Sequence, residues 1–168
     1  MKLAVIYDSL TDHTKQCADW IVEGINSVKD VEAKDFKYDA VDTDYVKEAK
    51  GVVLGSPSYA AQMTPAFHTW MLTEAGKLNM GGKLGGAFAT QQFSHGGGEL
   101  VIQSIHTFML VWGMLVYSGG GAKGRPVIHT GPVATNSNVE EFSRLEDYRD
   151  YFVIFGERFA EKAKELFG

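Results

Sequence analysis

The chain has 168 residues, of which 45% are hydrophobic and 22% charged, a balance typical of a folded globular protein and not of a disordered one. Lys and Arg number 16 against 21 Asp and Glu, so the formal net charge is −5, and no basic run favours a nucleic acid or an anionic membrane as a partner. The single Cys17 excludes an internal disulfide and a cysteine metal cluster, and no apolar stretch reaches the roughly 20 residues of a membrane span. We therefore expect one cytoplasmic domain over residues 1–168.

Short apolar runs alternate with segments of helical periodicity. The predicted strands cover residues 3–7, 31–36, 51–55, 84–90 and 114–117. The predicted helices cover residues 12–28, 41–49, 65–71 and 99–112, and a last helix follows the capping-box pattern Ser137-x-x-Glu140. This alternation is typical of βαβ crossovers, so we predict an α/β sandwich of three layers with five parallel strands in the order 2-1-3-4-5.

In such a sheet, ligands bind outside the carboxyl ends of the strands, near the point where the strand order reverses. We expect the site in the loops after the first, third, fourth and fifth strands, which cover residues 8–14, 56–63, 91–98 and 118–136. The last of these is long enough to be a lid or binding loop. Its Lys123 and Arg125 could pair with the pyrophosphate of a nicotinamide cofactor, or they could be surface charges without a function in binding.

The first loop carries three hydroxyl groups in the pattern Ser9-x-Thr11-x-x-Thr14. The start of a helix offers free N–H groups and a partial positive charge, so neutral hydroxyl donors there can hold a phosphate dianion without Lys or Arg. Simple capping of the helix by Thr11 or Asp12 is the alternative explanation.

The first loop and two later motifs, taken in chain order, resemble the motifs of a known protein family. Ser9-x-Thr11-x-x-Thr14, Gly55-Ser56-Pro57-Ser58-Tyr59 and Gly96-Gly97-Gly98, followed by Glu99, resemble the FMN-binding loops of the flavodoxin superfamily. The likeness is strongest to NAD(P)H:quinone oxidoreductases of the tryptophan-repressor-binding-protein type, and it extends to Trp112-Gly113-Met114 and Gly124-Arg125-Pro126. It implies a flavodoxin-like fold, bound FMN, NADH or NADPH as electron donor, a quinone or similar acceptor, and a dimer or tetramer.

The resemblance also assigns residue roles. Tyr59 and Phe93 would stack on the flavin ring, and the amides of the glycine triplet would stabilise negative charge on the reduced ring. His95 is the candidate for supplying a proton or a positive charge, unless it is only an exposed loop residue. Trp112, where related quinone reductases carry a His, and His129 are candidates for the substrate side, with core packing as the alternative for Trp112. The predicted FMN-binding residues are Ser9, Leu10, Thr11, Asp12, His13, Thr14, Pro57, Ser58, Tyr59, Ala60, Ala61, Thr90, Gln91, Gln92, Phe93, Gly96, Gly97 and Gly98.

Two positions depart from the family pattern. Asp12 stands where Gly is common, and a carboxylate about 6 Å from a phosphate charge costs roughly 3 kcal/mol at an effective dielectric near 20. We expect Asp12 to face solvent or cap the helix, or else to weaken FMN binding. Ala60-Ala61 replaces the glycine whose peptide flips in one-electron flavodoxins. Because a left-handed non-glycine residue costs roughly 1–2 kcal/mol, we expect no flip and a two-electron flavin.

Other classes of protein also deserve comparison. A non-enzymatic electron carrier suits the fold and the acidic charge, but the absence of glycine between Gly55 and Gly76 and the triplet at Gly96 favour an enzyme. Asp8-Ser9-Leu10 resembles the nucleophile block of GDSL-type esterases, yet Tyr7 replaces the first Gly and no Asp-x-x-His follows near the C-terminus. A receiver-type phosphorylation domain would need an Asp where Gly55-Ser56 ends the third strand.

Overall fold

The computed structural model describes residues 1–140 and 143–168, and its centre is a parallel sheet. The main path runs in the order β2-β1-β3-β4-β5, and β6 pairs with β4. The predicted strand order is therefore confirmed. The strands are β1 (Lys2–Tyr7), β2 (Glu32–Lys37), β3 (Gly51–Pro57), β4 (Leu84–Gln91), β5 (Leu115–Val116) and β6 (Val133–Thr135).

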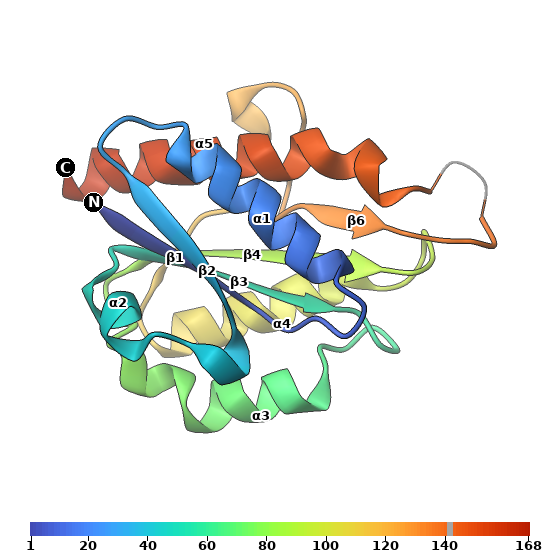
Figure 1. The fold of residues 1–168 in the computed structure, drawn as a ribbon, viewed down its shortest axis with the longest axis horizontal. Coiled ribbons are helices and arrows are strands. Elements are labelled where there is room, and N and C mark those ends of the chain that lie inside the picture. Colours follow the sequence, from blue (N-terminus) through green and yellow to red (C-terminus); the bar gives the residue numbers. More distant parts are fainter. Residues whose placement is uncertain (141–142) are drawn as a thin grey trace.

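Helices cover both faces of the sheet and complete the predicted three layers (Figure 1). Alternate residues of β1 point to opposite faces: Leu3 and Val5 pack in one apolar cluster, and Ala4 and Ile6 in the other. The first cluster lies under α1 (His13–Asn26) and α5 (Arg149–Phe167). The second lies under α2 (Thr43–Glu48), α3 (Pro65–Thr73) and α4 (Gly98–Val111). Among the helices of residues 1–140 and 143–168, none has both the length and the apolar character needed to cross a membrane.

The sheet has one short strand in addition to the five predicted, because β5 and β6 share the outer position beside β4. β5 pairs only with Leu84 and Gly85 at the start of β4, and β6 pairs with residues 89–91 at its end. The segment between β5 and β6 leaves the sheet and packs against α5. The sequence does not predict β6, because its three residues, between Pro132 and Asn136, are too few to show a strand pattern that differs from a loop.

The predicted helix start at Ser137 is also wrong. The Ser137 hydroxyl accepts hydrogen bonds from the amides of Val139 and Glu140, at 3.2 and 3.1 Å, which makes a local turn. The Glu140 carboxylate does not return to Ser137, but accepts from the amide and hydroxyl of Ser94 at 2.9 and 2.6 Å. The helix begins only at Arg149.

A buried arginine holds the long loop that follows β5. Arg158 is 6% exposed, and its guanidinium donates to the carbonyl oxygens of four loop residues. A buried guanidinium is tolerated when its donors are hydrogen-bonded, and here every partner is a backbone carbonyl. The carbonyls belong to Gly119, Lys123, Arg125 and Pro126, at 3.0–3.4 Å.

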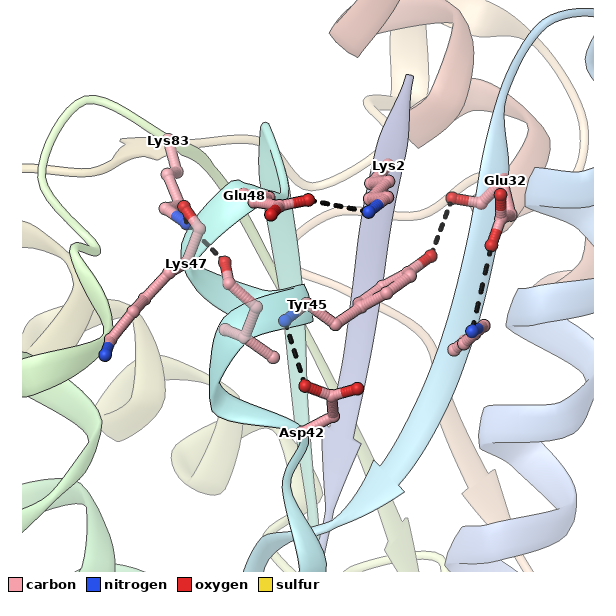
Figure 2. Close-up of polar contacts among 9 residues, drawn as sticks. Lys2, Glu32, Asp42, Tyr45, Lys47, Glu48 and Lys83 are labelled. Carbon is pink, nitrogen blue, oxygen red and sulfur yellow. Dashed lines mark hydrogen bonds and ion pairs between the residues drawn. The ribbon is translucent and has the colours of Figure 1, made fainter.

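A second buried cation fixes the short helix α2 (Figure 2). Lys83, just before β4, donates to the carbonyls of Val46 and Lys47 at the helix end. At the other end, the Asp42 carboxylate accepts from the Tyr45 amide at 3.0 Å. Burial, assisted by the charge of Lys50, lowers the pKa of Lys83 from 10.5 to about 8.

This lowered pKa predicts a pH-dependent stability. Between pH 8 and 10.5 the unfolded chain keeps a proton on Lys83 that the folded chain releases, so the contribution of Lys83 to the free energy of unfolding rises with pH. The slope is at most about 1.4 kcal/mol per pH unit. Urea unfolding of the parent chain and of Lys83→Met should diverge in this window, in favour of the parent. The exposed Lys47→Met is the control, and a constant difference for Lys83→Met across the window would contradict the assignment.

Candidate functional site

A cavity of about 660 Å³ lies at the carboxyl edge of the sheet, where β1, β3 and β4 end. Three of the four predicted loops, 8–14, 56–63 and 91–98, surround it together with a segment after β6. Its lining residues are Leu10, Thr11, His13, Thr14, Pro57, Ser58, Tyr59, Ala60, Ala61, Thr90, Gln91, Gln92, Phe93, His95, Gly96, Asn136 and Asn138. Within the described part of the chain, this lining contains no Asp, Glu, Lys or Arg.

The start of α1 presents neutral hydrogen-bond donors to this cavity. The amides of His13 and Thr14 open the helix, so they have no intrahelical acceptor, and the helix end carries a partial positive charge. The hydroxyls of Thr14 and Thr90, both buried, lie 2.8 Å apart. One hydrogen bond between two hydroxyls leaves one O–H free to donate to an acceptor in the cavity.

His13 is held by two residues that are far apart in the sequence. The Asn136 side-chain nitrogen lies 3.0 Å from His13 Nε2 and 3.4 Å from Nδ1, and His13 Nδ1 lies 3.2 Å from Thr11 Oγ1. The Thr11 hydroxyl, like that of Thr14, is an uncharged polar group on the cavity wall.

Ser9 and Asp12 belong to the same loop but do not line the cavity. Ser9 Oγ accepts from the Lys15 amide at 3.3 Å, so this hydroxyl caps the helix. Asp12 is exposed, makes no side-chain capping bond and has a left-handed backbone with φ 63°. Glycine adopts this conformation without strain, and Asp and Asn are the non-glycine residues that tolerate it best. The Asp12 carboxylate therefore faces solvent.

The second loop contains a tight turn whose two central residues are alanines. Tyr59 and Gln62 exchange backbone hydrogen bonds of 2.8 and 3.0 Å, and the φ angles of Ala60 and Ala61 are 50° and 62°. Positive φ at both central residues defines a type I′ turn. Both alanines are thus already left-handed, so the strain of about 1–2 kcal/mol for each, from which we argued against a flip, is present in this turn.

A glycine opposite this turn lets the second and third loops meet. A Cβ atom on Gly97 would lie 2.4 Å from the Cβ of Ala61, and the φ of Gly97 is 79°. The Ser58 hydroxyl joins the same two loops by donating to the Gly96 carbonyl at 2.6 Å. Loop packing, and not only access to a ligand, therefore requires glycine here.

Two amides of the glycine triplet are already used within the protein. The Gly98 amide donates to Gln91 Oε1 at 2.8 Å, and the Gly96 amide donates to the Phe93 carbonyl at 2.9 Å. Gln91 Nε2 in turn donates to Thr135 of β6 at 3.1 Å. The expectation that these two amides stabilise a reduced ring is therefore wrong, and Gln91 acts as a connector of the third loop, α4 and β6.

Large side chains form the mouth of the cavity. Tyr59 and Phe93 are 49% and 45% exposed, which leaves apolar ring surface available at the site. The exposed His95 belongs to the third loop, as Phe93 does, and lines the same cavity. Ring stacking by Tyr59 and Phe93 and proton supply by His95 stay predictions.

The structure does not bring Trp112 to the cavity. The 14-residue helix α4 starts beside the cavity and runs about 21 Å away from it, so Trp112 lies near the opposite edge of the sheet. There its ring packs at 5.7 Å from that of Phe108 and beside Gly76. This placement favours the packing alternative for Trp112, because the helix end that faces the cavity is the other one.

Apart from Asn136 at its end, the predicted long loop 118–136 likewise stays outside the cavity. Its exposed Lys123, Arg125 and His129 are absent from the lining, and the Arg158 contacts hold the loop against α5. The surface interpretation of Lys123 and Arg125 is thus the better one.

The predicted binding residues include neither Asn136, the last residue of the predicted long loop, nor Asn138. These two residues line the cavity because β6 is parallel to β4 and ends at the same edge, and the Asn136 amide donates to the Gln91 carbonyl at 2.9 Å.

Comparisons with known protein sequences place this site in a family. Residues 1–123 match the family model of NADPH-dependent FMN reductase. A flavodoxin of Clostridium saccharobutylicum is 37% identical over 167 residues, which cover 99% of this chain and 100% of the flavodoxin. An NAD(P)H dehydrogenase (quinone) of Geotalea daltonii is 28% identical over 143 residues, covering 69% of this chain and 70% of the relative.

A solved structure extends the match to the whole fold. A flavodoxin from the domain Archaea superposes with a TM-score of 0.72 at 27% identity, covering 98% of this chain and 99% of that one. The chain therefore belongs to the NADPH-dependent FMN reductase family, a group of FMN-binding, flavodoxin-like oxidoreductases.

Proposed function

We propose that the cavity binds FMN and that the protein passes two electrons from NADH or NADPH to a quinone or a similar small acceptor. The observation that carries the two-electron assignment is the turn at Ala60-Ala61. Family membership supports FMN, and the quinone dehydrogenase relatives support the donor and acceptor classes. We further propose that residues 1–168 act as one FMN-binding unit.

The residues present fit FMN. The volume of about 660 Å³ lies in the range of roughly 300–1,000 Å³ typical of cofactor sites. The phosphate would be held by the hydroxyls of Thr11 and Thr14 and by the amides that open α1. These uncharged donors can hydrogen-bond a phosphate dianion. Tyr59 and Phe93 would cover the ring, whose faces are apolar. FMN, when bound, supplies hydride and electron transfer chemistry that no side chain of the cavity has.

The role of the protein in this reaction would be to position the flavin ring and to shield it from water. Tyr59 and Phe93 would exclude water from the ring. His95 would hold a proton at the rim of the cavity, where it lies among the lining residues. The tie between Ser58 and Gly96 would keep the second and third loops at a fixed separation.

The alanine turn supports a site without a peptide switch. Rotation of the Ala60–Ala61 peptide would change the type I′ turn into type II′. In type II′ the first central residue has φ near 60° and ψ near −120°, a region that is essentially available only to glycine. The Cβ of Ala60 therefore blocks the rotation, although the turn itself is left-handed.

A flavodoxin-type electron carrier is the second candidate. The full-length 37% identity to a flavodoxin favours it, as does the net charge of −5. A carrier receives electrons from another protein and is not reduced directly by a nicotinamide cofactor, so the two candidates differ in one measurement.

Direct reduction tests the proposed function. FMN added to the purified chain should bind, with quenching of flavin fluorescence, and anaerobic NADH or NADPH should then bleach its absorbance in a stopped-flow instrument. A quinone should restore the oxidised spectrum over repeated turnovers. Binding without direct reduction would assign the carrier function instead, and a folded chain that does not bind FMN would exclude both.

Two single substitutions test the role of the turn. Ala60→Gly opens the type II′ turn and should allow the one-electron-reduced flavin to accumulate in a reductive titration, whereas the parent should show little of it. Ala61→Gly is the matched control, because the second central residue of a type II′ turn has an ordinary negative φ. It should relieve strain by about 1 kcal/mol without changing the titration. Equal accumulation in the parent and both variants would contradict the proposed block.

Substitutions of Asp12 separate backbone strain from charge. Asp12→Gly should raise the free energy of unfolding by about 1 kcal/mol, because glycine adopts φ 63° without strain. Asp12→Asn should leave stability nearly unchanged. Both should tighten FMN binding by only about two- to fivefold, since the carboxylate faces solvent and is screened. Calorimetric titration at low and high salt measures this effect, and a hundredfold gain would show that the carboxylate faces the phosphate.

A further inference from the structure

A second cavity, of about 410 Å³, lies between α2 and α3, which cover the same face of the sheet (Figure 1). Its volume is within the range of roughly 300–1,000 Å³ typical of small-molecule sites. It shares no lining residue with the cavity at the carboxyl edge, and we call it the α2/α3 cavity. Its lining residues are Tyr38, Asp39, Val41, Thr43, Lys47, Trp70, Glu74, Lys77 and Leu78.

The two helices beside the α2/α3 cavity are fixed by contacts of their own. Lys83 and Asp42 hold the two ends of α2 (Figure 2). On α3, the Thr64 hydroxyl caps the helix by accepting from the Phe67 amide at 3.3 Å. Because these contacts need no ligand, the cavity is preformed, and binding there costs little ordering of the protein.

Aromatic side chains form one wall of the α2/α3 cavity. The rings of Phe67 and Trp70 stack with their centres 5.6 Å apart and their planes 14° apart, and the Tyr38 ring lies edge-on to Trp70 at 6.3 Å. Phe67 is fully buried, whereas Tyr38 and Trp70 are half-buried and line the cavity. Aromatic rings associate by offset stacking and by edge-to-face contact, so this wall favours a flat aromatic ligand.

Lys47 supplies the unpaired charge of this cavity. Of the other charged lining residues, Glu74 pairs with Lys77 at 3.0 Å, and Asp39 lies 3.7 Å from Lys37. Lys47 forms no ion pair with a residue of 1–140 or 143–168, and Figure 2 shows its side chain extended from α2 with no contact at the nitrogen. A hydrogen bond from an ammonium is strongest to an anionic oxygen, so Lys47 favours a ligand with a carboxylate.

We infer that the α2/α3 cavity binds a small, flat aromatic carboxylate. The ligand ring would pack against Trp70 and Tyr38, and its carboxylate would accept a hydrogen bond from Lys47 Nζ. The Thr43 hydroxyl, one helical turn from Lys47, offers a second donor in the lining.

Other classes of small ligand use the cavity less completely. A neutral hydrocarbon would leave Lys47 without a partner, and an inorganic anion would leave the aromatic wall uncovered. A cation is disfavoured because Asp39 and Glu74 already have lysine partners. The inference does not depend on the proposed redox function, because the two cavities have no residue in common.

An NMR titration tests whether such a ligand binds here. The chain has three tryptophans, so its proton–nitrogen spectrum has three indole N–H signals, and Trp70→Phe identifies the one from Trp70. Naphthoate should shift the Trp70 signal in a saturable manner. The signal of Trp20, which is buried against Phe152 of α5, should stay unchanged. Added FMN should leave the Trp70 response as it is, because the cavities are separate.

A matched pair of ligands and of variants tests the role of the charge. Naphthalenemethanol carries the same ring without a charge and should bind the parent chain about tenfold more weakly than naphthoate. Lys47→Ala should raise the dissociation constant of naphthoate about tenfold and leave that of the alcohol nearly unchanged. Lys50→Ala, at an exposed lysine outside the lining, is the control and should change neither.

Both lysines are exposed, so neither substitution should unfold the chain. A Trp70 signal that does not respond to naphthoate, or a response that FMN abolishes, would overturn the inference. Equal affinity of the parent for naphthoate and the alcohol, or an equal loss in the two lysine variants, would overturn the assignment of a carboxylate ligand.

Discussion

The cavity depends on Thr90, the residue before last in β4, because it joins loops that are far apart in sequence. Its carbonyl accepts from the Ser58 amide at 2.7 Å, which aligns the second loop with the end of β4. Its hydroxyl lies 2.8 Å from that of Thr14, which fixes the start of α1. Parallel pairing of β1, β3 and β4 brings these groups to one edge of the sheet, and the buried hydrogen bonds then determine how far apart the loops sit.

Backbone strain is concentrated around the same cavity. In the described part of the chain, three of the five non-glycine residues with positive φ are Asp12, Ala60 and Ala61, all in the loops that surround it. Such strain persists only where neighbouring contacts fix the conformation. The exchanged hydrogen bonds of Tyr59 and Gln62, together with the contact of Ala61 on Gly97, supply that support. The strain is thus part of how the second loop keeps one shape.

The sequence predicted the strand order and the positions of the loops because buried apolar runs and helical periodicity are local signals. It did not predict β6, and therefore missed Asn136, because a three-residue strand is defined only by its partner in β4. It also misassigned the glycine triplet, since the contact of Gly97 with Ala61 joins two loops that no local pattern relates. For Trp112 the sequence already favoured packing over catalysis, because the length of α4 implied that its two ends lie at opposite edges of the sheet.

The distribution of charge along the chain separates the cavity from the helices α1 and α5. Residues 51–73 and 100–122 contain no Asp, Glu, Lys or Arg. The first stretch forms β3, the alanine turn and α3, and the second forms most of α4 together with β5. Removing a charge from water is costly unless it is paired, so surfaces that lose water on binding are best built from uncharged residues. The cavity wall around Tyr59 meets this requirement through the first of these segments, whereas α1 and α5 keep the charges that face solvent.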